Sequence, residues 1–283
     1  MLNEKITVLT RAKLNLYLDI VGTRADGYHL LETVLQSVDL CDIVEVSAAR
    51  EGIAVSCSNP EIPTGEKNIC YKAAKRFIER VGGKFGAEIR IEKRIPDGAG
   101  LGGGSADAAA VLYALNELNG LPMRSDELLQ LAAEIGADVP FCLTGGLAVC
   151  KGIGEVIEPL KPLPELFYLI VKPNFRCPTQ SAYQLWDSAP VSAKNMLKAF
   201  CNAGSRYPEL LYNVFEEIYG NVEISSIKTK LRDTGALGSC LTGSGSAVFG
   251  VYETAEQAAS AAHAFPEMFT AVAKPVGSGL AVI

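Results

Sequence analysis

The chain has 283 residues, of which 48% are hydrophobic and 20% are charged. This length and this hydrophobic content suffice for one large domain or two medium ones, and they exclude an intrinsically disordered protein. The 26 Lys and Arg residues are outnumbered by 32 Asp and Glu residues, and the resulting net charge of −6 argues against nucleic-acid binding.

No run of about 18 apolar residues is present, so no membrane-spanning helix is predicted. The first 18 residues carry four charges and lack the apolar core of a signal peptide. The eight cysteines form no CxxC pair and the two histidines lie far apart, so no metal site is expected. Scattered cysteines in a chain of this length are typical of reduced core residues, which predicts a cytoplasmic protein.

Strands dominate the predicted elements of the first third. Runs of β-branched residues and of alternating apolar and polar residues predict strands at 11–18, 43–46, 53–56 and 87–92, and residues 30–38 follow a turn at 26–29. In the first of these, the alternation predicts that Lys13, Asn15 and Tyr17 share one face. A helix is predicted over 68–80, closed by Gly82 and Gly83.

The rest of the chain mixes helices and strands. Helical periodicity is found at 106–119, 125–136, 179–186, 193–200, 224–234 and 255–265. A hairpin is predicted at 147–156, and strands at 166–171 and 247–252. Between the hairpin and the next strand lies a proline-rich stretch, which we interpret as a boundary between domains 1–160 and 161–283.

The most distinctive feature is a loop with five glycines between residues 98 and 104, directly before the helix predicted at 106. Glycine lets the backbone approach a ligand closely, and the amino end of a helix attracts phosphate. No Gly-Lys-Ser/Thr follows, which excludes a P-loop. Gly98, Gly100 and Gly103 satisfy GxGxxG, but the acidic residue that a dinucleotide site needs, Glu117, lies in the same helix. The loop therefore predicts a phosphate site, and Ser105 either caps the helix or contacts a phosphate-bound magnesium ion.

Other candidates have two interpretations when only the residues are considered. Asp138 either caps a turn or serves as a base, and Lys13 either lies on a solvated strand face or neutralises charge. Tyr28 and His29 follow a turn and either pack against the protein or contact a ligand. The glycine-rich cluster 241–246 is equally compatible with a hairpin turn and a ligand contact.

Together these segments resemble the GHMP kinase superfamily, whose three ordered motifs correspond to residues 12–16, 96–106 and 241–245. Residues 24–33 and 136–142 further resemble the branch of that superfamily that phosphorylates a cytidine diphosphate derivative of methylerythritol. The resemblance implies a two-domain α/β (α+β) fold. Its N-terminal domain would resemble the second domain of ribosomal protein S5, and its C-terminal domain would be ferredoxin-like.

The resemblance also implies an activity, in which the γ-phosphate of ATP moves to the tertiary 2-hydroxyl of the methylerythritol unit in the non-mevalonate isoprenoid pathway. Lys13 and Asp138 would be the catalytic pair, with Asp138 accepting or orienting the hydroxyl proton and Lys13 stabilising charge on the transferring group. Magnesium would accompany ATP. The residues implied in ATP binding form one continuous segment: Pro96, Asp97, Gly98, Ala99, Gly100, Leu101, Gly102, Gly103, Gly104, Ser105 and Ala106.

The small-molecule cytidine diphosphate substrate would contact Asn15, Tyr28, His29, Thr179 and Tyr183. At the last position the family commonly has phenylalanine, so Tyr183 keeps a ring face and adds a hydroxyl. Three alternatives are weighed against this interpretation: another GHMP kinase, such as one for homoserine or mevalonate; a catalytically silent nucleotide-binding protein; and an NAD-dependent dehydrogenase. Retention of both Lys13 and Asp138 argues against the silent protein.

Overall fold

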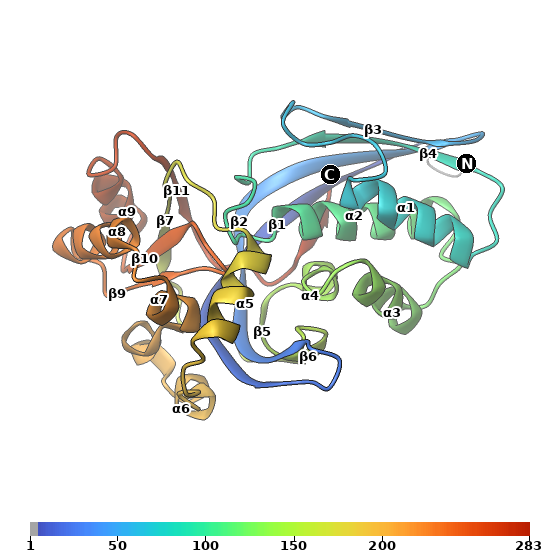
Figure 1. Ribbon diagram of the computed structural model, residues 1–283. Helices are drawn as coiled ribbons and strands as arrows, with labels where there is room; N and C mark the ends of the chain where they lie inside the picture. Colours follow the sequence, from blue (N-terminus) through green and yellow to red (C-terminus); the bar gives the residue numbers. More distant parts are fainter. Residues whose placement is uncertain (1–4) are drawn as a thin grey trace.

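The computed structural model describes residues 5–283. Its central element is a long antiparallel hairpin of β1 (Lys5–Thr23) and β2 (His29–Ala49), drawn in blue in Figure 1. Within the described residues this hairpin belongs to an eight-stranded sheet with the order β12-β1-β2-β4-β3, in which β5 also pairs with β2, β6 with β5, and β8 with β1. The other strands are β3 (Ile53–Cys57), β4 (Gly86–Glu92), β5 (Leu147–Gly152), β6 (Val156–Pro159), β8 (Tyr212–Asn213) and β12 (Leu280–Val282).

Strand β2 joins residues 30–38, which follow the predicted turn, to the strand predicted at 43–46. Its first half pairs with β5 and its second half with β4. A register shift opposite the link between Arg11 and Ala12 marks the change of neighbours. No glycine or proline interrupts residues 38–43, so the strand bends there without ending.

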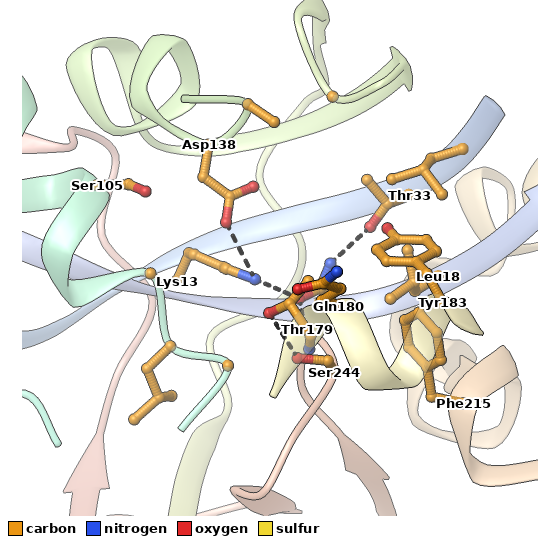
Figure 2. A pocket seen from close by; sticks show the side chains of 18 of the residues that line it. Lys13, Leu18, Thr33, Ser105, Asp138, Thr179, Gln180, Tyr183, Phe215 and Ser244 are labelled. Atoms are coloured by element: carbon orange, nitrogen blue, oxygen red, sulfur yellow. Dashed lines mark hydrogen bonds and ion pairs between the residues drawn. The ribbon is translucent and has the colours of Figure 1, made fainter. Parts of the chain in front are cut away.

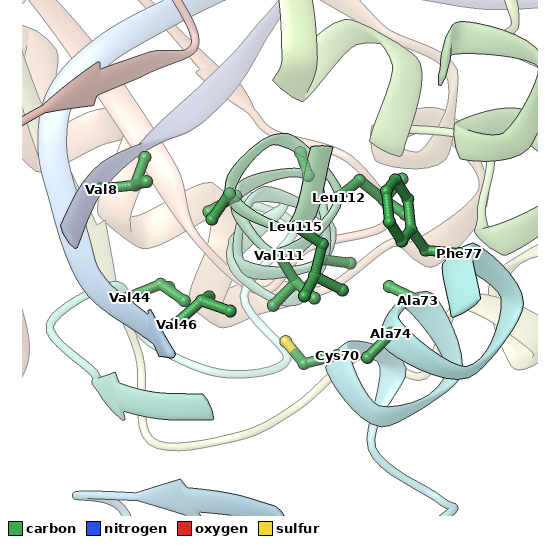
Figure 3. Close-up of a cluster of buried hydrophobic side chains, with 14 of the residues drawn as sticks. Val8, Val44, Val46, Cys70, Ala73, Ala74, Phe77, Val111, Leu112 and Leu115 are labelled. Atoms are coloured by element: carbon green, nitrogen blue, oxygen red, sulfur yellow. The ribbon is translucent and has the colours of Figure 1, made fainter. Parts of the chain in front are cut away.

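Three helices cover one face of this sheet: α1 (Ile69–Arg80), α2 (Gly103–Leu118) and α4 (Val139–Thr144). Helix α3 (Ser125–Ile135) packs against these helices. Helix α2 lies centrally, and Figure 3 shows its Val111 and Leu115 between strand residues and Phe77 of α1. The helix starts at Gly103, with Gly102 as its N-cap, earlier than the sequence predicts. Ser105 therefore lies inside the first turn and does not cap it.

A second sheet has four antiparallel strands in the order β11-β7-β10-β9. They are β7 (Phe167–Lys172), β9 (Gly238–Leu241), β10 (Val248–Tyr252) and β11 (Phe269–Ala273). When the four strands are numbered 1 to 4 as they follow one another in the chain, their order across the sheet is 4-1-3-2, the arrangement of a ferredoxin-like domain. The helices of this part are α5 (Thr179–Ser188), α6 (Leu197–Cys201), α7 (Val214–Tyr219), α8 (Val222–Asp233) and α9 (Ala255–Ala262), with a 3₁₀ helix at Gly204–Leu210.

Helix α6 begins four residues later than predicted. The backbone N–H groups of Lys194 and Asn195 donate to the buried carboxylate of Asp19, and Asn195 has a φ of 54°, so neither residue is helical.

A buried apolar cluster contains Leu14 and Leu16 of the first sheet and Tyr168 and Phe249 of the second. The domain boundary predicted near residue 160 falls between β6 and β7. Within residues 5–283, no helix has the length and apolar character required to cross a membrane.

Candidate active site

A cavity of about 740 Å³ opens where β1, β2, the glycine loop, α5 and the loop before β10 meet. Figure 2 shows Lys13 and Asp138 near its centre, Ser105 on one side, and Tyr183 and Phe215 on the other. Segments that are far apart in the sequence thus contribute to one site.

A β-bulge decides which residues of β1 face this cavity. The register of β1 against β2 shifts between Asn15 and Tyr17, so Lys13, Asn15 and Leu18 line the cavity while Tyr17 points into the core. The prediction that Tyr17 shares a face with Lys13 and Asn15 is wrong, because strict alternation does not survive an extra residue in one strand. The hydroxyl of Tyr17 instead donates to Asp19 over 2.9 Å.

Lys13 and Asp138 come together across the cavity. Lys13 Nζ lies 3.6 Å from Asp138 Oδ2 and donates to Asn15 Oδ1 over 2.7 Å. Lys13 is only 4% exposed, so the alternative of a solvated strand face is wrong. The Asp138 side chain is 37% exposed and precedes the first turn of α4, whose residues Val139 and Pro140 are buried. A buried cation thus faces an accessible carboxylate, an arrangement suited to holding a hydroxyl beside a developing negative charge.

Asn15 connects the three segments that resemble the superfamily motifs. Its Oδ1 also accepts from the N–H of Gly243 over 2.8 Å, and its Nδ2 donates to Thr33 Oγ1 over 2.9 Å. The hydroxyl of Thr242 accepts from the Asn15 N–H and lies 3.2 Å from the carbonyl oxygen of Gly100. Asn15 faces the cavity, and these contacts hold both Lys13 and the glycine loop in place. The roles of Thr33 and Thr242 depend on pairing between distant strands, which the sequence does not specify.

The glycine loop needs its glycines for packing as well as for ligand access. Gly100 and Gly102 have φ values of 77° and 72°. A Cβ on Gly100 would lie 2.0 Å from the carbonyl oxygen of Thr242, and one on Gly102 would lie 2.9 Å from Cγ of Lys13. Residues 96–105 all line the cavity. Ala106 does not, because the first turn of α2 directs it into the core, where it is fully buried.

The opposite end of the cavity is aromatic. The rings of His29 and Tyr183 stack with centroids 4.7 Å apart, and Phe215 meets Tyr183 edge-on at 5.2 Å. Tyr28 is 60% exposed beside them. His29 packs against Tyr183 and also lines the cavity, whereas Tyr28 leaves its ring free. Burial raises the pKa of Tyr183, so its hydroxyl stays protonated at neutral pH.

The sequence does not identify Asp187 as part of this end. Its Oδ1 lies 2.7 Å from His29 Nε2. Asp187 is four residues after Tyr183 on α5, one residue beyond the end of the helix predicted at 179–186, so the two share a face. That spacing is the signal that could have found it. Thr179, which the resemblance assigns to the substrate, lines the cavity, and its hydroxyl lies 3.1 Å from that of Ser244.

The chain is similar to known kinases. Family models match residues 68–146 (GHMP kinases N terminal domain) and 221–271 (GHMP kinases C terminal). The chain is 40% identical over 278 residues to the 4-diphosphocytidyl-2-C-methyl-D-erythritol kinase of Syntrophomonas wolfei, covering 96% of this chain and 98% of that one. It is 44% identical to the kinase of the same name from Caldicellulosiruptor saccharolyticus, covering 89% of each.

The chain belongs to the 4-diphosphocytidyl-2-C-methyl-D-erythritol kinase family of GHMP kinases. A crystal structure of a 4-(cytidine 5'-diphospho)-2C-methyl-D-erythritol kinase superposes with a TM-score of 0.80 at 34% identity, covering 96% of this chain and all of that one. This GHMP kinase is thus a small-molecule kinase that uses ATP, and its two-domain fold is the one predicted. The dehydrogenase alternative is wrong.

Proposed function

We propose that this kinase transfers the γ-phosphate of ATP to the 2-hydroxyl of 4-diphosphocytidyl-2-C-methyl-D-erythritol, and that it does so in the cytoplasm. One observation supports this most strongly. Lys13 Nζ and Asp138 Oδ2 lie 3.6 Å apart in a cavity that has the glycine loop at one end and aromatic side chains at the other. From the glycine loop to the aromatic end, the cavity thus offers a place for a triphosphate, then for a reacting hydroxyl, and then for a cytosine ring.

The ATP triphosphate would lie against the loop, where backbone N–H groups and the amino end of α2 favour negative charge. Gly98, Gly100 and Gly102 have positive φ values, a conformation that glycine adopts without strain, and they carry no side chain that could hinder the approach of a phosphate. Magnesium usually keeps several waters and takes only one or two oxygen ligands from the protein, besides the phosphates. The hydroxyl of Ser105 and the carboxylate of Asp138 line the cavity and are oxygen donors of this kind. A bound magnesium ion would neutralise phosphate charge.

The phosphoryl transfer itself would depend on Asp138 and Lys13. The 2-hydroxyl oxygen forms a bond to the γ-phosphorus as the bond from that phosphorus to the β,γ-bridging oxygen breaks, and ADP leaves. Asp138 orients the hydroxyl or accepts its proton. Lys13, held by Asn15, places a buried positive charge next to the transferring group, where it stabilises negative charge as that charge develops.

Cytosine recognition would fall to the aromatic end. Tyr28 offers an exposed ring face, and the stacked pair of His29 and Tyr183 forms the adjacent wall. Stacking supplies affinity for any base. Selection of cytosine therefore requires polar groups at the base edge, such as the imidazole and backbone of His29.

The decisive experiment measures ADP release with the cytidine diphosphate substrate, mevalonate or homoserine as acceptor. We expect turnover with the first and background rates with the other two, and loss of turnover when Asp138 is replaced by Asn. Equal rates with mevalonate or homoserine would contradict the proposed substrate. Unchanged turnover in Asp138→Asn would contradict the proposed role of this carboxylate.

A further inference from the structure

Three charged side chains form a buried cluster beneath the glycine loop. The side chains of Lys93, Asp42 and Asp107 are 6%, 0% and 4% exposed. Lys93 Nζ pairs with Asp42 Oδ2 and lies 2.8 Å from Asp107 Oδ2. None of the three lines the cavity, so they do not contact a ligand there.

The cluster connects the two ends of the loop. Lys93 lies three residues before Pro96, where the loop begins, and Asp107 lies in α2, two residues after Ser105. Asp42, on β2, fixes the entry to the loop, because its Oδ1 accepts from the N–H groups of Arg94 over 2.5 Å and Ile95 over 2.8 Å.

The exit from the loop is fixed by Asp107. Its Oδ1 accepts from the hydroxyl of Thr10 on β1 over 3.3 Å. The ammonium of Lys93 therefore bridges the loop entry, the loop exit and the central hairpin of the first sheet.

The contact demands a close approach between the loop entry and α2. A Cβ on Gly103 would lie 3.0 Å from Lys93 Nζ and 3.0 Å from Cγ2 of Ile95. A side chain on the first helical residue would therefore press on Lys93 and Ile95. Gly103 thus leaves room for the contact between Lys93 and Asp107 beneath the loop, and it also lines the cavity.

The cluster places one ammonium group between two carboxyl groups. Burial lowers the pKa of Lys93, but the charges of Asp107 and Asp42 outweigh this effect, so the net shift of the pKa is upward. Burial raises the pKa of Asp107 to about 8, against the opposing effect of Lys93. Buried ion clusters often add little stability compared with apolar groups of the same size, so stability alone does not account for this one.

We propose that Lys93 is a positioning residue for ATP, which ties the entry of the glycine loop to α2 so that the loop N–H groups converge on the triphosphate. This inference rests on the proposed placement of ATP at the loop. Preorganised donors bind phosphate better than a loop that must be ordered on binding. Loss of the tie should therefore weaken ATP binding and leave the distant cytidine end unaffected.

The test compares two variants. Asp107→Asn keeps an oxygen for Lys93, because a carboxamide resembles a protonated carboxyl group, and it should bind ATP like the wild type. Lys93→Met/Asp107→Asn removes the tie and leaves Asp42 with its two backbone donors, so that no uncompensated pair of carboxylates is buried. We expect this double variant to bind a non-hydrolysable ATP analogue at least about 10-fold more weakly by calorimetry.

Lys151→Met is the matched control, because Lys151 pairs with Glu158 over 3.0 Å away from the loop. Its ATP affinity should equal that of the wild type, as should the KM of the double variant for the cytidine substrate. ATP affinity within about 2-fold of the Asp107→Asn value in the double variant, even with a lower Tm, would reduce the cluster to a structural role and overturn the proposal. Since calorimetry needs no acceptor, failure of the proposed function would appear separately, as absent ADP release by the wild type.

Discussion

The two ends of the cavity are built in different ways. At the phosphate end, Lys13, Asn15 and Thr242 are buried, and hydrogen bonds connect them to one another and to the glycine loop. At the base end, which is the aromatic end of the cavity, Tyr28 is largely exposed and follows a short exposed turn, and His29 is held by its contact with Asp187 and by stacking on Tyr183. Groups that stabilise a transition state gain from rigid placement, whereas a stacking surface tolerates small movements. We therefore expect changes at the first end to alter turnover or ATP binding, and changes at the second to alter substrate affinity.

The largest effect should come from Asp138→Asn. The carboxamide has nearly the same shape but cannot accept the hydroxyl proton, so kcat should fall by roughly 10²-fold or more. ATP and substrate affinities should stay within a few-fold of wild type, as measured by direct binding. A loss of binding with preserved kcat would make Asp138 a binding residue instead.

Lys13→Met should also lower kcat, by roughly 10- to 10²-fold, because it removes the buried charge beside the transferring group. Lys13 and Asp138 lie 3.6 Å apart and act on the same reacting centre. The effect of the double variant with Asp138→Asn should therefore be smaller than the product of the two single effects. Fully multiplicative losses in steady-state kcat would show that the two side chains act independently.

Gly102→Ala should weaken ATP binding by roughly 10-fold, because a left-handed backbone strains alanine. Its Cβ would also press on Lys13, at 2.9 Å from Cγ. Gly120→Ala is the control: Gly120 has a φ of 75°, and a Cβ there would meet nothing within 4 Å. If calorimetry shows that both variants lose ATP affinity equally, the contact between residue 102 and Lys13 does not account for the loss of ATP binding.

Tyr28→Ala tests the base end. Loss of one stacking face should raise the KM for the cytidine substrate by roughly 10-fold, and the KM for ATP should barely change. Steady-state kinetics with each substrate varied in turn measures both values. A raised KM for ATP with an unchanged KM for the cytidine substrate would mean that the two ends are assigned the wrong way round.

Tyr183→Phe should have the smallest effect. Within residues 5–283 the hydroxyl of Tyr183 makes no hydrogen bond, while its ring stacks on His29. We expect the KM for the cytidine substrate to stay within about 2-fold of wild type, since only the ring face contributes to stacking. A larger increase would assign the hydroxyl a direct contact with the substrate.

The sequence predicts the glycine loop and α2 well, because glycine density and helical periodicity are local properties. It misplaces Tyr17, because a bulge depends on the pairing of two strands and not on the residues of one. It also misses Asp42 and Lys93, whose contact with Asp107 arises only when β2, the loop entry and α2 come together. The residues of the site are thus predictable where one segment carries the function, and not where several segments share it.

A double-mutant cycle measures whether the two ends of the cavity act independently. The measurement is kcat/KM for the cytidine substrate in Asp138→Asn, Tyr28→Ala and the double variant. If one end performs the chemistry and the other binds the base, the two losses multiply to within about 2-fold, as expected for sites that do not interact. A double variant no worse than Asp138→Asn alone would contradict this account, because it would show that the base end acts only through the catalytic carboxylate.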